Sequence, residues 1–343
     1  MSRTLWIAAT LLAPLAGWAY PIAPQTLWDL TQQAELVVLA HVEAVEQWES
    51  VDGDRNSSHV ARLRILETWK GLAAKGVAVR FNPNVICPAP ASYVEGRRVV
   101  AFLSRDGKGW FTVGRSYGTR YPEDVREETE LATVVKAALA AQRAKAPPQD
   151  GAKNQPPPRA TLNWAMLAVK GRATRWDGLY ALRSAADPAH AFYDRDRGED
   201  APLPEETLEQ LEAIFVATPS YDETLPQMLR LLQDRKSAAI TQAGVDALET
   251  VLHNSSAPWW TDEVLDLLAE RLAGPKPPPV VPADPLEAEM AHVLRGRGET
   301  KEARDERLQS SWDAFKKRHG LEPRLRDDYV RTKHTGTGAQ TPL

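Results

Sequence analysis

The chain of 343 residues contains a single cysteine, Cys87. One thiol excludes a fold held together by intrachain disulfides, and it excludes a zinc or iron–sulfur site built from several cysteines. We interpret Cys87 as a free thiol that packs as a small apolar side chain, with pairing between two chains as the alternative. No histidine or lysine adjoins it in the sequence, so a nucleophilic role is not predicted.

The chain also lacks an excess of charge of either sign. It carries 42 Lys or Arg and 46 Asp or Glu, which gives a formal net charge of −4. Residues 20–145 alone carry 16 basic and 15 acidic residues, without a basic stripe. Binding to nucleic acid requires concentrated positive charge, so nucleic acid is not an expected partner.

Long hydrophobic runs are missing after residue 19, where no stretch reaches the roughly 18 apolar residues of a membrane helix. Residues 1–19 combine Arg3, an apolar stretch over Leu5–Leu15 and a small-x-small pattern ending at Ala19. This order is typical of a secretory signal peptide. We therefore expect cleavage near Ala19 and an extracytoplasmic protein, periplasmic or secreted. No membrane anchor is expected, because Trp18 stands where a lipidated cysteine would be needed.

Two proline-rich stretches, residues 146–158 and 274–285, divide the rest of the chain. Proline fixes φ and lacks the backbone donor, so neither stretch is expected to form a helix or a central strand. We interpret both as extended linkers. They separate three pieces, residues 20–145, 159–273 and 286–343.

The first piece has the pattern of a small β-domain with a flanking helix. In residues 60–69 Ala61, Leu63 and Ile65 alternate with polar residues, which is typical of a half-buried strand. The residues 99–103 form a continuous apolar run. Five short strands predict a small, closed or nearly closed barrel of the OB type. The expected strands are 36–45, 60–69, 77–81, 99–103 and 110–113, with helices at 26–34 and 123–145.

Three segments of this piece, residues 34–42, 64–71 and 102–107, carry a family resemblance. Residues 34–120 resemble the netrin-like domain, the OB-type barrel found in tissue inhibitors of metalloproteinases. In those inhibitors the mature chain begins with a cysteine that chelates the protease zinc. Here the expected first residue is Tyr20, so the resemblance implies the barrel but not the zinc-blocking segment.

The second piece has a helical pattern, with apolar residues three and four positions apart. In the segment 245–252, Leu248 and Val251 lie on an apolar stripe, whereas Asp246, Glu249 and Thr250 face away from it. Helices of this length joined by short turns resemble HEAT-type helical repeats, and an ordinary helical bundle is the alternative. The expected helices are 162–169, 176–182, 208–215, 225–232, 245–252 and 264–272.

The last piece is dense in charge. Residues 299–318 predict one helix whose apolar face holds Leu308, Trp312 and Phe315. From Arg324 onward the residues are mostly polar, with glycines, and we expect a disordered tail.

One catalytic motif occurs in the chain. Residues 114–118 match the G-x-S-x-G nucleophile elbow, which would make Ser116 the nucleophile of a hydrolase. The residues that follow do not begin a helix on the serine, and the surrounding strands lack the βαβ order of such enzymes. We therefore interpret the two glycines as backbone requirements at the exit of the barrel.

The seven histidines are scattered without the spacing of a metal site. No catalytic residue, metal or cofactor is therefore predicted. The histidines are His41, His59, His190, His253, His292, His319 and His334.

Two adjacent tryptophans, Trp259 and Trp260, follow Pro258 at the start of an expected helix. Neighbouring indoles at a helix start cannot both face the core, so one is a candidate for contact with a partner. A packed helix end is the alternative. The sequence as a whole predicts an exported, non-catalytic protein that binds another envelope or secreted protein. An inhibitor of extracytoplasmic proteases and a hydrolase using Ser116 are the alternative hypotheses.

Overall fold

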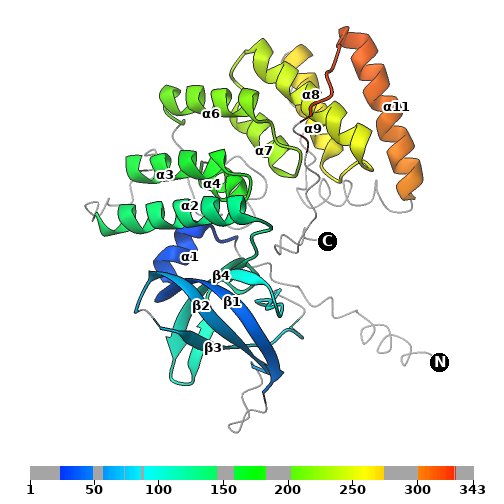
Figure 1. Cartoon of the computed structure of the whole chain (residues 1–343). Helices are drawn as coiled ribbons and strands as arrows, with labels where there is room; N and C mark the ends of the chain where they lie inside the picture. Colours follow the sequence, from blue (N-terminus) through cyan, green and yellow to red (C-terminus); the bar gives the residue numbers. More distant parts are fainter. Residues whose placement is uncertain are drawn as a thin grey trace, which may run out of the picture. The chain divides into compact units, whose positions relative to one another are not determined.

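The computed structural model describes residues 24–48, 57–72, 74–85, 89–144, 158–182, 202–273, 300–327 and 329. Within these residues the strands come first along the chain and most helices follow (Figure 1). None of the described helices is long and apolar enough to cross a membrane. The expected signal peptide, Cys87 and both proline-rich linkers except Pro158 lie outside the described residues.

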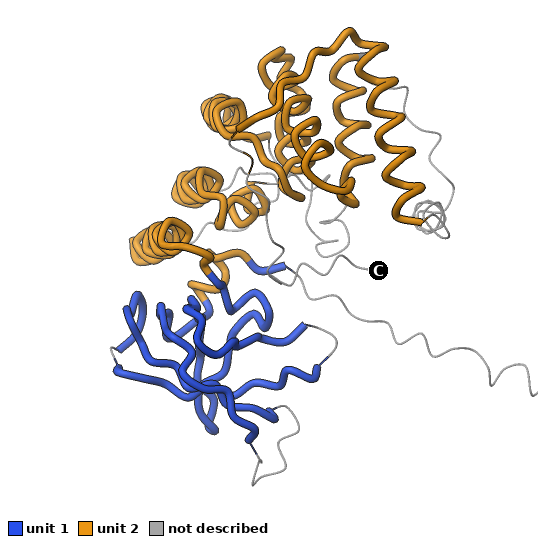
Figure 2. The backbone as a smooth tube through the Cα atoms, turned by 45° about the vertical axis from the view of Figure 1, so that its right-hand side comes forward, with its two compact units in different colours: residues 1–25, 33–121, 336–343 blue, residues 26–32, 122–335 orange. Residues whose placement is uncertain are grey.

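The chain divides into two compact units, which Figure 2 colours separately. Unit 1 holds the strands and includes Gln33–Tyr121. Unit 2 holds the helices and consists of Thr26–Gln32 and Pro122–Thr335. The helix after the strands, which the sequence analysis grouped with them, therefore counts with the other helices.

Unit 1 is a mixed sheet of six strands in the order β1-β2-β3-β5-β4-β6. Strand β1 also pairs with β4, so that five of the strands form a ring. Strands β3 and β5 are parallel, and the other pairings are antiparallel. All five expected strands are present, and β6 is a two-residue addition. The strands are β1 (Leu36–Gln47), β2 (His59–Lys70), β3 (Gly76–Phe81), β4 (Arg98–Asp106), β5 (Gly109–Thr112) and β6 (Thr119–Arg120).

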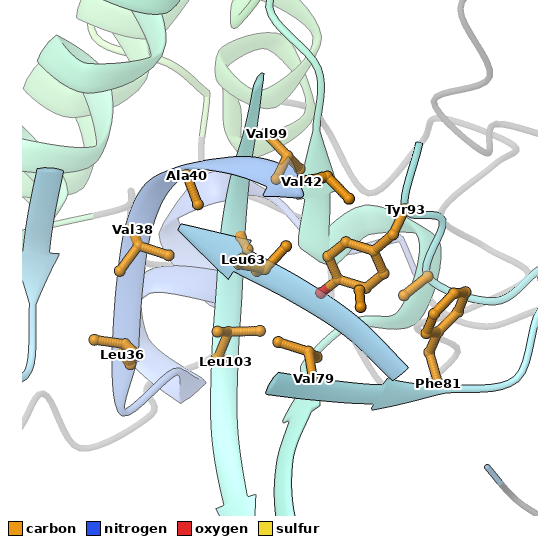
Figure 3. Close-up of a cluster of buried hydrophobic side chains, with 13 residues drawn as sticks. Leu36, Val38, Ala40, Val42, Leu63, Val79, Phe81, Tyr93, Val99 and Leu103 are labelled. Carbon is orange, nitrogen blue, oxygen red and sulfur yellow. The ribbon is translucent and has the colours of Figure 1, made fainter. Parts of the chain in front are cut away.

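The core of unit 1 follows from the alternation of side chains along the strands. Every second residue of β1 between Leu36 and Val42 points into one apolar cluster, where Leu63, Val79 and Leu103 of other strands meet it (Figure 3). Strand β4 differs, because all of residues 99–103 are fully buried. Burial on both faces explains why this strand has a continuous apolar run rather than alternation.

Unit 2 contains nine described α-helices. Helices α3, α6 and α8 contact one another in succession and form one layer, and α4, α7 and α9 form a second. Helix α2 packs on α3, and α11 packs on α9. All six helices expected in the second piece are present. The helices are α1 (Leu27–Gln33), α2 (Val125–Arg143), α3 (Arg159–Lys170), α4 (Arg175–Leu182), α6 (Glu205–Ala217), α7 (Thr224–Leu231), α8 (Ala238–Asn254), α9 (Thr261–Ala273) and α11 (Lys301–His319).

Helix α11 shows how sequence signals set its limits. The hydroxyl of Thr300 accepts a hydrogen bond from the N–H of Ala303 at 3.2 Å and caps the first turn. Gly320 ends the helix with φ of 61°, a conformation that glycine adopts without steric cost. The expected apolar face is confirmed, because Leu308, Trp312 and Phe315 are buried.

Candidate functional site

The corner between α8 and α9, residues 255–261, holds the two adjacent tryptophans. Helix α8 ends where the N–H of Ser255 donates to the carbonyl of Val251 at 3.0 Å. Helix α9 begins where the carbonyl of Trp260 accepts a hydrogen bond from the N–H of Val264 at 3.2 Å. Both tryptophans therefore lie in a short connection whose two ends are fixed by helix termini.

The two indoles have opposite environments. Trp260 is 2% exposed, and Trp259 is 55% exposed. Consecutive residues at a helix start project in different directions, so packing one ring in the core leaves the other in water. A large exposed aromatic side chain is the kind of group that anchors protein interfaces.

Helix α11 holds the backbone of this corner in place. The guanidinium of Arg304 donates to the carbonyl of Pro258 at 2.8 Å. The carboxylate of Asp305 accepts from the N–H of Ala257 at 3.1 Å. These bonds fix the residues immediately before Trp259, so its backbone requires little ordering when a partner binds.

The same helix is tied to α8 by charged groups. The carboxylate of Glu249 accepts hydrogen bonds from the indole of Trp312 and from the ammonium of Lys316, the latter at 3.0 Å. Burial opposes the charged form of Lys316, but hydrogen bonds to Glu249 and Asp313 outweigh it and raise the pKa of the ammonium. Helix α11 is therefore a structural part of unit 2 that supports the corner.

Polar residues of α8 show a feature that the sequence analysis missed. The sequence pattern places Asp246 and Thr250 away from the apolar stripe, yet they are only 7% and 0% exposed. Residues after α11 cover them, because the N–H groups of Arg324 and Arg326 donate to these two side chains. Residues 324–327 and 329, expected in a disordered tail, are thus described by the structure. No local pattern signals this contact, since the partners lie more than 70 positions apart.

Most of the G-x-S-x-G segment forms a 3-10 turn, Arg115–Gly118, which Val113 and Gly114 connect to β5. Gly114 has φ of 65°, and a Cβ atom on Gly118 would lie 1.8 Å from the carbonyl oxygen of Val113. Arg115, not Ser116, has the positive φ, of 52°. The N–H of Ser116 donates to the carbonyl of Ala89 at 3.2 Å. Both glycines are therefore required by the backbone, independently of any reaction at the serine.

Histidines and carboxylates do not gather around a common point in the part of the chain that the structure covers, where no group of three or more potential metal ligands occurs. His59 shares a hydrogen bond with the hydroxyl of Ser58 at 2.9 Å, and His319 packs on the ring of Phe315. His190, His292 and His334 lie outside the described residues.

The chain matches no family model, no curated protein and no solved structure. The resemblances to netrin-like domains and to HEAT-type repeats therefore stay predictions. The corner around Trp259 is therefore the candidate site for contact with a partner protein.

Proposed function

We propose that this protein is an exported, non-catalytic binding or scaffold protein whose partner is another envelope or secreted protein. The observation that carries the proposal is the solvent exposure of Trp259, a large aromatic side chain. Hydrogen bonds from α11 fix the backbone of the corner on which it stands. Burying an indole at an interface is strongly favourable, and a braced backbone lowers the entropic cost of binding.

The finer architecture belongs to the same proposal. A ring of five strands with one parallel closure supports an OB-type barrel, to which residues 34–120 add the resemblance to netrin-like domains. Two layers of helices that contact in succession support a HEAT-like stack. Both architectures present extended surfaces on which proteins bind other proteins.

The test is photocrosslinking from the corner itself. The photoreactive residue p-benzoylphenylalanine replaces Trp259 in the full chain, which is then incubated with the envelope fraction of its source. Val125, 72% exposed at the start of α2, is the matched control position in the same unit. We expect one discrete crosslinked species from position 259, absent from position 125 and competed away by the unmodified chain.

Three results would overturn the proposal. Crosslinking that is equal at both positions would show that Trp259 has no specific partner. Labelling of Ser116 by a fluorophosphonate, abolished in Ser116→Ala, would favour the hydrolase hypothesis. Stoichiometric inhibition of a zinc metalloprotease by the full chain would favour the inhibitor hypothesis.

A further inference from the structure

We propose that α8 carries a binding site for an extended, arginine-containing segment of a partner protein, and that residues 321–327 and 329 of the chain occupy this site in cis. The inference rests on the proposed role in protein binding and names the chemistry of the partner. Figure 1 shows the segment after α11, in red, running back past α8.

The segment is held by its backbone. The N–H of Arg324 donates to Oδ1 of Asp246 at 2.8 Å, and the N–H of Arg326 donates to Oγ1 of Thr250 at 3.1 Å. Two residues of extended chain span about 6.6 Å, close to the roughly 6 Å between positions four apart on a helix. One turn of α8 therefore matches alternate N–H groups of any extended segment.

The two acceptors are oriented before the segment binds. The hydroxyl of Thr250 donates its proton to the carbonyl of Asp246 at 2.7 Å, which leaves its lone pairs to accept. The side-chain amide of Gln242 donates to Oδ1 of Asp246 at 2.7 Å and fixes that carboxylate. Both acceptors are buried, so each would lose a hydrogen bond if the segment left and nothing replaced it.

The contacts made by side chains select for arginine and an aromatic residue. The guanidinium of Arg326 donates to the carbonyl of Ala217 at the end of α6, at 3.3 Å. The ring of Tyr329 meets Tyr221 edge to face, with centroids 5.4 Å apart. Leu325, which lies between the two arginines, is 52% exposed, so this position is free to vary.

The charge of the surrounding helices points to a basic partner. Residues 202–273 and 301–319, which contain α6 to α9 and α11, carry 17 Asp or Glu and 10 Lys or Arg, a formal charge of −7. The cis segment 321–329 has two arginines but also three acidic residues, a formal charge of −1. Electrostatic attraction therefore favours an extended segment with the same arginines and fewer acids, which would displace the cis segment.

The test uses a labelled peptide in trans with the full chain. The probe is fluorescein-LQPRLRQQY, the sequence of residues 321–329 with its three acids replaced by glutamine, titrated by fluorescence anisotropy. We expect Arg326→Pro, which removes an N–H and a guanidinium from the cis segment, to tighten binding of the probe about tenfold. In that background Thr250→Val should weaken it about fivefold, and Thr250→Ser should restore it.

The controls separate the backbone contacts from general attraction. A probe N-methylated at the two arginine amides keeps its charge and should bind at least about fivefold more weakly. Equal binding of the two probes, or no effect of Thr250→Val, would overturn the inference. Loss of cooperative thermal unfolding in Arg326→Pro would also overturn it, because the segment would then be an integral part of the fold. Trp259→Ala should leave the titration unchanged, so failure here and failure of the crosslinking test are distinct results.

Discussion

The two units of the molecule are held together in different ways. The core cluster of unit 1 consists of apolar and aromatic side chains. Among the described residues of unit 1, the buried polar ones are Arg80, Thr119 and Arg120. The described residues of unit 2 include many more buried polar side chains. They are Thr26, Thr31, Thr174, Arg175, Asp177, Thr207, Ser220, Thr224, Asp246, Thr250 and Thr261.

The reason for the difference lies in the backbone. A ring of strands pairs most of its N–H and C=O groups within the sheet, whereas every helix leaves such groups unpaired at both ends. In unit 2 buried and half-buried side chains supply the partners. Arg271, for example, donates to the carbonyls of Leu232 and Arg235 at 2.7 and 2.6 Å, in the connection between α7 and α8.

Arg175 likewise donates to backbone carbonyls, and its side chain is more deeply buried. Its Nε donates to the carbonyl of Val169 at 3.1 Å, and its Nη1 donates to the hydroxyl of Ser220 at 3.0 Å. Desolvation lowers the pKa of the guanidinium, which is the cost of placing this charge between α3, α4 and the turn after α6. Unit 1 is thus specified by an apolar pattern, and unit 2 depends on single polar residues as well.

The largest expected effect tests the backbone of unit 1. Gly118→Ala places a methyl group against the carbonyl of Val113, so we expect a loss of more than about 4 kcal/mol in the free energy of unfolding. Hydrogen exchange of the amides of β4 and β5 measures it. Ser116→Ala is the control, and a loss above about 1 kcal/mol there would contradict our account of the motif.

The two tryptophans test whether unit 2 also depends on apolar packing. Trp260→Ala should cost about 3–5 kcal/mol, because it leaves a cavity beside α9. Trp259→Ala should change stability by less than about 0.5 kcal/mol, because the side chain is largely in water. Urea denaturation followed by circular dichroism compares the pair. Equal losses would contradict the division between a packed ring and an exposed one.

Arg175→Met tests the polar half of the comparison. The substitution keeps much of the apolar stem but leaves buried carbonyl and hydroxyl groups without a donor, at an expected cost of about 2–3 kcal/mol. Arg126→Met is the control, since that side chain is 80% exposed and pairs with Glu130 at the surface. Thermal unfolding compares both variants with the wild type. Equal melting temperatures for all three proteins would show that buried polar groups do not stabilise unit 2.

The smallest effect concerns pH. Hydrogen bonds from Ser237 and Arg235 lower the pKa of Glu212 below its ordinary value of 4.5. A carboxylate with a depressed folded-state pKa stabilises the fold above its unfolded-state pKa, and this contribution disappears as pH falls through the folded-state value. We expect Glu212→Gln to be less stable than wild type by under about 1 kcal/mol at pH 7. The difference in stability between Glu212→Gln and the wild type should disappear below about pH 4.5. Thermal unfolding of both proteins at each pH measures it.

Several elements were predictable because their signals are local. The period-two alternation of β2, the apolar run of β4 and the apolar stripes of six helices each mark one element. The exposure of one indole of the pair Trp259 and Trp260 followed from their adjacency. What covers Asp246 and Thr250 was not predictable, because polar residues opposite an apolar stripe have the same pattern whether water or a distant segment meets them.

The sequence by itself determined which segments form strands and helices, since periodicity within ten or twenty residues depends on which side chains share a face. Only the tertiary structure decided that β1 pairs with both β2 and β4, that Trp259 rather than Trp260 is exposed, and that residues 324–326 return to α8. These facts depend on contacts between residues far apart in the chain. A local pattern carries information about a face, and it carries none about the identity of what packs against that face.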